Sequence, residues 1–460
     1  MLAGLGAAGV TGLAGCTGGG NGDSEPTATD TATDTEMDGG GATVTQQASG
    51  TVKIGALQPL SGDLQYYGQQ ALWGFYQGFN YKGDDDFAPP AESGTHTATI
   101  GDVDYELVVR DTELSADTAQ TAATDLVTNE DVDMLFGCTS SASATRVITT
   151  VSQQSGVPTM IGPAASADIT ANAETCAPNV FRASENTAMD ARSGGQYVAN
   201  NSDVSRVYLF GADYSFGRAV VNNYRSVLEA NGVEIVGERF VPQGYSEWEG
   251  LLDQAEEAGA EGIVAGFTVA TLPQLFTTFL NGDYPFRVFG GFATQITTSI
   301  VGQTLQRVLG EPLTAEKLSD ANFGPFTTRY HWNQYDNEIN RTFVESYTDA
   351  YGIVPDLFTS GTFTAGSAIV QAVEAGGSTE GADIQGELRG MVVADTPKGE
   401  DGYEFQTYNN QARSAMTIAD VVPNDEDNWD ALIKPSEPVS TVAKGNTTIP
   451  SDSSEMGCNL

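Results

Sequence analysis

The sequence predicts an α/β protein built from two doubly wound, parallel-sheet lobes. From Thr51 onward, short apolar strands alternate with amphipathic helices, which is typical of parallel sheets covered by helices on both faces. The alternating series occurs twice, so we expect two such sheets. Apolar residues make up 40% of the 460-residue chain, which is sufficient for two hydrophobic cores.

Each predicted element follows the hydrophobic period of a strand or a helix. The first series consists of strand 52–57, helix 68–81, strand 105–110, helix 116–129, strand 134–136, helix 141–155 and strand 159–161. The second series consists of strand 206–210, helix 217–231, strand 234–240, helix 248–258, strand 262–265, helix 272–281 and strand 288–289. Further along, Ile339, Phe343 and Tyr347 recur at four-residue spacing, which predicts one face of another helix.

Residues at the ends of these segments support the predicted boundaries. Glycine accepts the left-handed backbone that commonly ends a helix. The glycines expected in this role are Gly232, Gly259, Gly282, Gly352 and Gly376. Ser246 and Glu249 form the S-x-x-E pattern of a capping box, which predicts the start of the helix near Trp248.

Cys16 follows a short apolar run that closes with Leu13-Ala14-Gly15. This is the lipobox pattern of secreted lipoproteins, and the run is too short to span a bilayer. We therefore predict that residues 1–16 are a signal peptide and that Cys16 carries lipid. Residues 17–50 have almost nothing to bury and are predicted to be a disordered tether. No basic residue precedes the run, so a cytosolic protein with a chance cysteine is the alternative.

The chain is strongly acidic, with 61 acidic and 20 basic residues and a formal net charge of -41. Binding a phosphate backbone requires clustered Lys and Arg, so nucleic acid is excluded as a natural partner. The repulsion between carboxylates opposes compaction, but molar salt shortens the Debye length to about 3 Å and screens it. The composition therefore resembles that of proteins from extremely halophilic archaea. An acidic mesophilic protein is the alternative.

Besides Cys16, the chain contains Cys138, Cys176 and Cys458. An odd number in an exported protein suggests one disulfide and one free thiol. Cys138 follows the apolar strand 134–136 and is expected to be buried. Cys176 and Cys458 are therefore the favoured disulfide pair.

Several chemical patterns are missing from the sequence. Only His96 and His331 are present, and no Cys or His pair has metal-ligand spacing. There is no phosphate-binding loop and no Gly-x-Ser-x-Gly nucleophile motif. We expect no metal, no cofactor and no enzymatic activity. A hydrolase that uses a carboxylate pair remains a weaker alternative, because acidic residues occur throughout the chain.

The chain contains an ordered series of segments that begins with Thr51-Val-Lys-Ile-Gly-Ala-Leu-Gln-Pro-Leu-Ser-Gly-Asp and includes Asp213-Tyr-Ser-Phe-Gly217. The other segments are Tyr67-Gly68 with Gly74, and residues 107–112, 136–141, 156–158, 163–166, 180–182, 340–343 and 395–399. This series resembles the Leu/Ile/Val-type solute-binding proteins of ABC transporters. The resemblance extends over about residues 51–423, nearly all of the predicted mature chain.

The resemblance implies a type I periplasmic-binding-protein fold, with two Rossmann-like lobes joined by a three-strand hinge. Residues 51–183 and 323–409 would form lobe 1, and residues 184–322 and 410–436 would form lobe 2. Residues 437–460 would be a C-terminal tail, and the crossings would lie near residues 182–185, 322–325 and 408–411. The ligand is expected in the cleft between the lobes, beyond the carboxyl ends of the strands.

The resemblance also implies which residues hold the ligand. Ser140 or Ser141, together with Ala164 and Ser166, match the groups that bind a ligand carboxylate. Main-chain N–H groups near Ala164 and Ala165 would add donors, and Tyr67 matches an aromatic wall of the side-chain pocket. The choice between Ser140 and Ser141 stays open, because the segment between Gly137 and Gly156 has one extra residue. Either serine could instead cap a helix.

Three positions depart from the amino-acid-binding members of the family. Phe216, Phe267 and Phe292 stand where those members have Tyr, Tyr and Glu, of which the latter two contact the ligand ammonium. Burying an ammonium without a partner costs about 3–5 kcal/mol. Unless Asp213 substitutes, we expect a hydrophobic carboxylate or an amide as ligand. The alternative is an alignment that slips by one or two residues.

Together these features predict a lipid-anchored solute-binding protein on the outer face of the cytoplasmic membrane. We expect a monomer that passes a small organic ligand, a branched-chain amino acid or a related hydrophobic carboxylate or amide, to the permease and ATPase subunits of an ABC importer. The alternative function is that of a ligand-sensing receptor with the same fold.

The lipobox assignment predicts the behaviour of a Cys16→Ser variant. The variant should leave the membrane fraction and stay folded, because the tether separates the anchor from the lobes. Membrane fractionation combined with circular dichroism checks this expectation. Retention of a variant whose signal peptide is still cleaved would contradict it.

Overall fold

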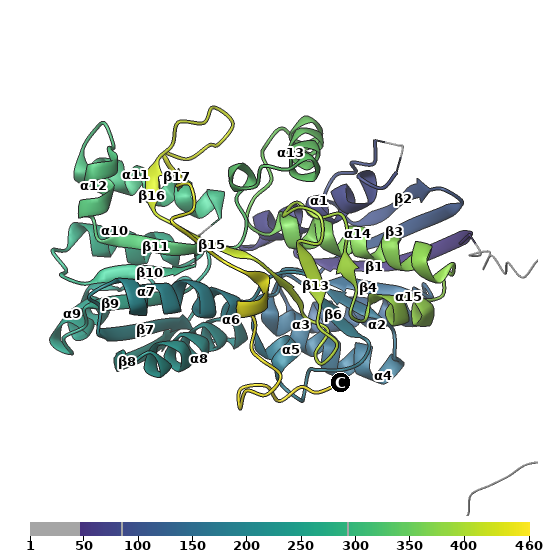
Figure 1. The fold of residues 1–460 in the computed structure, drawn as a ribbon, viewed down its shortest axis with the longest axis horizontal. Helices are drawn as coiled ribbons and strands as arrows, with labels where there is room; N and C mark the ends of the chain where they lie inside the picture. The colour runs from purple at the N-terminus through teal and green to yellow at the C-terminus, as the bar shows by residue number, and fades with distance from the viewer. Residues whose placement is uncertain (1–46, 84–85, 292–293) are drawn as a thin grey trace, which may run out of the picture. The chain divides into compact units, whose positions relative to one another are not determined.

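The computed structural model describes residues 47–83, 86–291 and 294–460. The predicted signal peptide with Cys16, almost all of the predicted tether, and Phe292 lie outside these residues. In the described part, two mostly parallel sheets each carry helices on both faces (Figure 1). The predicted α/β class with two doubly wound lobes is confirmed.

The first lobe contains a six-stranded sheet in the order β2-β3-β1-β4-β5-β6, parallel except for β2. Its elements are β1 (Gly50–Gln58), α1 (Gln65–Asn80), β2 (Gly94–Ile100), β3 (Val103–Asp111), α2 (Ala116–Thr128), β4 (Met134–Gly137), α3 (Ser141–Val147), a π-helical turn (Ile148–Ser152), α4 (Gln153–Ser155), β5 (Thr159–Ile161), α5 (Asp168–Ala171) and β6 (Val180–Arg182). Strand β2 was not predicted. It pairs with β3 through a turn at Gly101, whose φ of 59° suits glycine.

The second lobe contains a seven-stranded sheet in the order β18-β15-β11-β10-β9-β7-β8, in which β15 and β18 are antiparallel to their neighbours. Its elements are α6 (Thr187–Asp190), a π-helical turn (Ala191–Gly195), α7 (Gln196–Asn201), β7 (Arg206–Ala212), α8 (Ser215–Ala230), β8 (Glu234–Val241), α9 (Glu249–Glu257), β9 (Gly262–Gly266), α10 (Leu272–Asn281), β10 (Arg287–Gly291), α11 (Gln295–Leu309), α12 (Ala315–Asp320), β11 (Phe323–Thr328), β15 (Met416–Ala419), β16 (Val421–Pro423), β17 (Ile433–Pro435) and β18 (Ser440–Val442).

The remaining elements lie between β11 and β15 and just before the C-terminus. They are a 3-10 turn (Trp332–Gln334), α13 (Glu338–Tyr351), α14 (Thr359–Gly376), α15 (Gly381–Leu388), β12 (Val392–Val393), β13 (Tyr403–Phe405), β14 (Ala412–Ser414) and a second 3-10 turn (Lys444–Asn446). Ile339, Phe343 and Tyr347 form the buried face of α13. Because α13 and α14 pack on α1, this part of the chain belongs to the first lobe.

In the structure, two of the three segments that cross between the lobes lie later in the sequence than predicted. Strand β11 pairs with β10 and β15, so the chain stays in the second lobe until Thr328 and does not leave it at residues 322–325. Strand β14 pairs with β13, and the next strand, β15, already belongs to the second sheet. The third crossing therefore lies at Ala415, after the predicted residues 408–411. The first part of the predicted tail also joins the second lobe, because β18 pairs with β15.

Two local predictions differ from the structure. The Ser246–Glu249 capping box does not form: Trp248 is the N-cap of α9, and its buried ring packs against Phe210 and Phe267, which fixes where the helix begins. Gly282 has extended backbone, and the left-handed residue after α14 is Gly377 in place of Gly376.

The last residues of the chain are fastened to the first lobe. Cys176 and Cys458 form a disulfide with their Cα atoms 5.7 Å apart, and Cys138 is a buried free thiol. The main chain adds two hydrogen bonds, from Gly457 N to Ala171 O and from Leu460 N to Tyr408 O. The C-terminal segment therefore runs from the second sheet, at β18, back to the first lobe.

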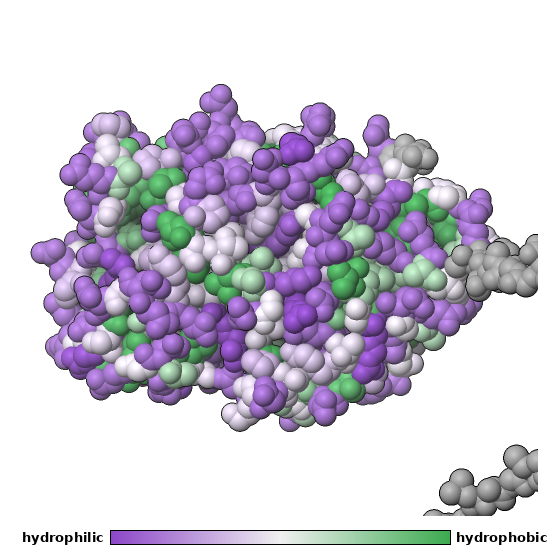
Figure 2. Space-filling view, viewed as in Figure 1, coloured by the Kyte–Doolittle hydropathy of each residue, from purple (hydrophilic) through white to green (hydrophobic). Residues whose placement is uncertain are grey.

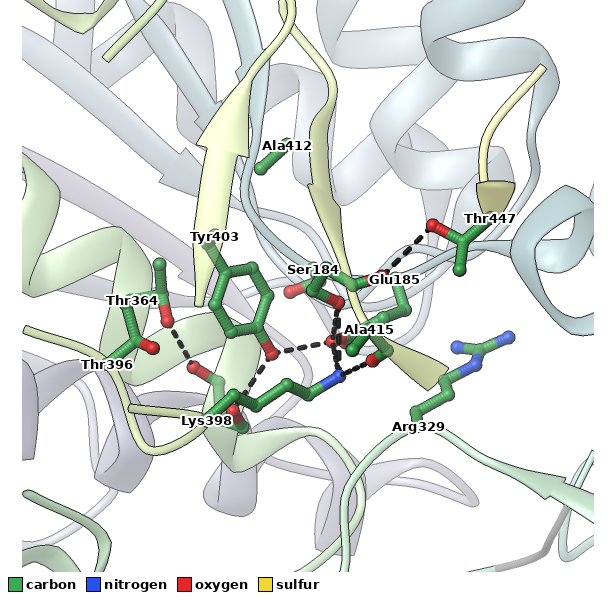
Figure 3. Close-up of polar contacts among 12 residues, drawn as sticks. Ser184, Glu185, Arg329, Thr364, Thr396, Lys398, Tyr403, Ala412, Ala415 and Thr447 are labelled. Carbon is green, nitrogen blue, oxygen red and sulfur yellow. Dashed lines mark hydrogen bonds and ion pairs between the residues drawn. The ribbon is translucent and has the colours of Figure 1, made fainter. Parts of the chain in front are cut away.

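A buried ion pair joins the segments that cross between the lobes (Figure 3). Lys398 Nζ lies 2.7 Å from Glu185 Oε1, and the two side chains are 1% and 2% exposed. Lys398 also donates to Ala415 O at 2.7 Å, while Tyr403 and Ser414 donate to the Glu185 carboxylate. Burial alone would raise the pKa of Glu185, but the charge and hydrogen bond of Lys398 outweigh it and lower that pKa.

This network predicts a large effect of Lys398→Met. The substitution leaves Glu185 charged and buried without its partner, so the free energy of unfolding should fall by about 3–5 kcal/mol. The double variant Lys398→Met/Glu185→Gln should recover most of that loss. Lys444→Met is the control, because Lys444 pairs with Glu404 at a half-buried site. Urea denaturation in molar KCl measures all three, and equal effects of the two lysine substitutions would contradict the prediction.

Candidate ligand-binding site

A cavity of about 140 Å³ lies beyond the carboxyl ends of strands from both sheets. Residues of the first lobe in its wall are Leu64, Tyr67, Thr139, Ser140, Ser141, Pro163, Ala165, Leu357 and Phe358. The aromatic residues of the second lobe in its wall are Tyr214, Phe216, Tyr224, Phe267, Phe276, Phe289, Phe323 and Phe326. The cavity is thus mostly apolar, with a few polar groups at defined places, as is usual for small-molecule sites.

The hydroxyl groups on the first-lobe side come from the turn between β4 and α3. Ser140 is the N-cap of α3, and among the described residues its side chain makes no capping hydrogen bond with that helix. The Oγ of Ser141 accepts a hydrogen bond from Ser166 N at 3.1 Å. Because that oxygen already serves the main chain, Ser140 is the better placed of the two hydroxyls to meet a ligand.

The structure does not bring all the predicted first-lobe residues to the cavity. Ala165 lines it, whereas Ala164 and Ser166 are absent from its wall as far as the described residues define it. Ala164 N donates to Cys138 O at 3.2 Å, and the carbonyl groups of Ala164 and Ser166 both accept from buried Arg182. These groups stabilise the loop behind the cavity wall.

Tyr67 forms a direct contact between the lobes. It lies on α1, which packs closely on α14: a Cβ atom added at Gly78 would stand 2.3 Å from Phe363 O. The ring of Tyr67 meets Phe358 edge to face at 5.1 Å, and its hydroxyl accepts a hydrogen bond from Val269 N of the second lobe at 3.0 Å. Burial raises the pKa of Tyr67, so the phenol stays protonated.

Aromatic side chains dominate the second-lobe side. Phe216 and Phe267 both line the cavity, and Phe267 is fixed by an edge-to-face contact with Trp248 at 5.2 Å. Phe292, predicted as their companion, lies outside the described residues. Tyr214, the N-cap of α8, lines the cavity two positions before Phe216, so the start of this helix presents a phenol as well as a phenyl ring.

The structure reveals a charged pair in the wall that the sequence did not indicate. Arg329 donates through Nε to Asp190 Oδ1 at 3.0 Å and through Nη2 to Asp190 Oδ2, and both residues line the cavity. They lie 139 positions apart, in segments that follow two different crossings, and no sequence pattern links them. Asp213, which was the possible substitute for the missing counter-charge, pairs with Arg218 at an exposed site.

A second buried carboxylate connects the lobes beside Tyr67. Asp356 Oδ2, in the loop before α14, accepts hydrogen bonds from Tyr66 Oη at 2.7 Å and from Gln295 N at 2.8 Å. Gln295 is the first residue of α11 in the second lobe, so Asp356 supplies a cap to a helix of the opposite lobe. Burial raises the pKa of Asp356 in spite of these hydrogen bonds.

Comparison with known proteins identifies the family. A model of the periplasmic binding protein family matches residues 51–427, and the chain belongs to that family. The chain is 28% identical over 357 residues to Leu/Ile/Val-binding protein homolog 6 of Brucella abortus, a match that covers 76% of this chain and 82% of the relative. Among the described residues, no helix is long and apolar enough to cross a membrane.

Solved structures share the fold at low identity. A leucine-binding protein from Thermotoga maritima has a TM-score of 0.68 at 17% identity, covering 86% of this chain and 99% of that protein. A solute-binding protein of an ABC transporter from R. palustris, in complex with 4-hydroxybenzoate, has a TM-score of 0.66 at 16% identity, covering 86% and 98%. These matches identify the two lobes as a type I periplasmic-binding-protein fold.

The contact between Tyr67 and Val269 predicts a measurable cost for Tyr67→Phe. Removing the hydroxyl leaves Val269 N without this partner, so the free energy of unfolding should fall by about 0.5–1.5 kcal/mol. Tyr76→Phe on the same helix is the matched control, since the described residues offer its buried hydroxyl no hydrogen-bond partner. Urea denaturation compares the two variants. An equal or greater loss for Tyr76→Phe would contradict the role given to Tyr67.

Proposed function

We propose that this member of the periplasmic binding protein family captures a small organic ligand between its lobes and delivers it to the permease and ATPase subunits of an ABC importer. One observation carries the proposal: the cavity is built from the carboxyl ends of two parallel sheets whose lobes are joined by crossing segments. Such an arrangement can close around a ligand by hinge bending. Domain closure of this kind requires no chemical step, so the proposal includes no catalysis.

The ligand we propose is a hydrophobic monocarboxylate or a neutral amide. Ser140 supports a polar end at the first lobe, and Phe216 and Phe267 offer apolar surface but no acceptor for an ammonium. The carboxylate of Asp190 is already paired with Arg329. The related structures span both chemistries, because one is a leucine-binding protein and another contains 4-hydroxybenzoate.

We further propose that the protein is a monomer held at the outer face of the cytoplasmic membrane by lipid on Cys16. The Cys176–Cys458 disulfide supports an oxidising compartment. Hydrophilic residues cover most of the face seen in Figure 2, with apolar residues in small, separate patches. With a net charge of -41, such a surface suits a protein exposed to concentrated salt.

The proposed ligand class predicts a preference between two molecules of similar shape. Isothermal titration calorimetry should show tighter binding of 4-methylpentanoate than of leucine, because the described wall residues offer no unpaired carboxylate to balance the buried ammonium of leucine. The expected difference is about 3–5 kcal/mol, or two to three powers of ten in affinity. Phe292→Glu, which supplies a carboxylate next to Gly291 in the sequence, should shift the preference toward leucine. Tight binding of leucine by the unmodified protein would contradict the proposed ligand class.

A further inference from the structure

We infer that Asp190 and Arg329 form a polar recess that recognises a neutral hydroxyl group on the ligand. This inference rests on the proposed function and adds a second recognition point to the apolar cavity. The two residues are buried, at 5% exposure for Asp190 and 7% for Arg329, and both line the cavity. Within the described part of the chain they are the only charged residues in its wall.

The recess is open toward the cavity because two glycines stand beside it. Gly290 and Gly291, at the end of β10, both line the cavity. A Cβ atom added at Gly291 would lie 3.7 Å from the carboxylate of Asp190, and one added at Gly290 would lie 4.0 Å from Tyr224 Oη. With no side chain at either position, a ligand atom can approach the charged pair from this side.

The pair keeps unused hydrogen-bonding capacity. Arg329 donates hydrogen bonds to Asp190 through Nε and Nη2, and its Nη1 has no hydrogen-bond partner among the described residues. Each Asp190 oxygen accepts one hydrogen bond from Arg329 and retains a second lone pair. Tyr224, which lines the recess, buries a hydroxyl that has no hydrogen-bond partner within the described residues. The recess can therefore both donate to a ligand and accept from it.

The charges determine which ligand group fits. Because the carboxylate and the guanidinium neutralise each other, the pair offers no net counter-charge to offset the desolvation of an ammonium or a carboxylate. A hydroxyl carries no charge to desolvate, and it can donate to an Asp190 oxygen and accept from Arg329 Nη1. The structure thus assigns Asp190 and Arg329 a role in specificity: they select a hydroxyl at the end of the ligand that enters the second lobe.

The test compares ligands that differ by one hydroxyl. Calorimetry would measure benzoate against 4-hydroxybenzoate, and 4-methylpentanoate against 4-hydroxy-4-methylpentanoate. In at least one pair the hydroxylated ligand should bind roughly ten- to hundredfold more tightly, because its hydroxyl bonds to charged groups. 4-(Aminomethyl)benzoate should bind more weakly than 4-hydroxybenzoate.

The same titrations on two double variants assign the preference to the recess. Asp190→Leu/Arg329→Met removes both charges together, so no unpaired buried charge remains. It should bring the affinity ratio of the hydroxylated to the unhydroxylated ligand close to one. Glu404→Leu/Arg413→Met removes a half-buried Arg–carboxylate pair on β13 and β14, outside the cavity wall, and should keep the preference. If the first variant fails to fold, Tyr224→Phe, which removes only one hydroxyl, should lower the preference.

Three outcomes would contradict the inference that the recess recognises a hydroxyl. They are no hydroxyl preference in either ligand pair, an unchanged preference in the variants of the recess, or tighter binding of 4-(aminomethyl)benzoate than of 4-hydroxybenzoate. Each of them leaves the proposed transport function intact, provided that an unhydroxylated acid binds. Failure of all these acids and of leucine to bind would instead contradict the proposed function itself.

Discussion

The buried ion pair between Glu185 and Lys398 is the interaction on which the two-lobed arrangement depends. Glu185 lies on the first crossing, and Lys398 also bonds to Ala415 on the third, so one ammonium group ties two crossing segments together. Next to it, Arg182 donates to Gln411 at 2.6 Å and joins the same two segments. Leaving either Glu185 or Lys398 unpaired at this depth would be costly, so their ion pair holds the crossing segments side by side. The cavity walls are therefore placed by charges that never contact a ligand.

The two sides of the cavity differ in chemical character. The first lobe keeps a hydroxyl at the turn before α3, whereas the second lobe presents aromatic rings and a neutralised charge pair. A buried ammonium needs an unpaired negative charge beside it, and the charge of Asp190 is already neutralised by Arg329. Specificity then depends less on the number of polar residues than on whether each is already paired.

Local patterns in the sequence predicted the strands and most of the helices, because hydrophobic period and helix-ending glycines act over a few residues. Strand β5 and helix α10 have the predicted bounds. The second and third crossings were misplaced, because only strand pairing determines which sheet contains β11 and β15. Tyr67, Ser140, Phe216 and Phe267 were found through a family resemblance. The pair of Asp190 and Arg329 was missed because only the folded chain brings them together.

The Cys176–Cys458 disulfide closes a covalent ring that includes all three crossings and spans 282 positions of the sequence. A protease that cuts any one exposed loop inside this ring leaves both fragments attached to each other. The fragments would separate only after a second cut within the ring or after reduction of the bond. For a member of the periplasmic binding protein family, such a ring keeps a chain that has been cut once in a single covalent piece.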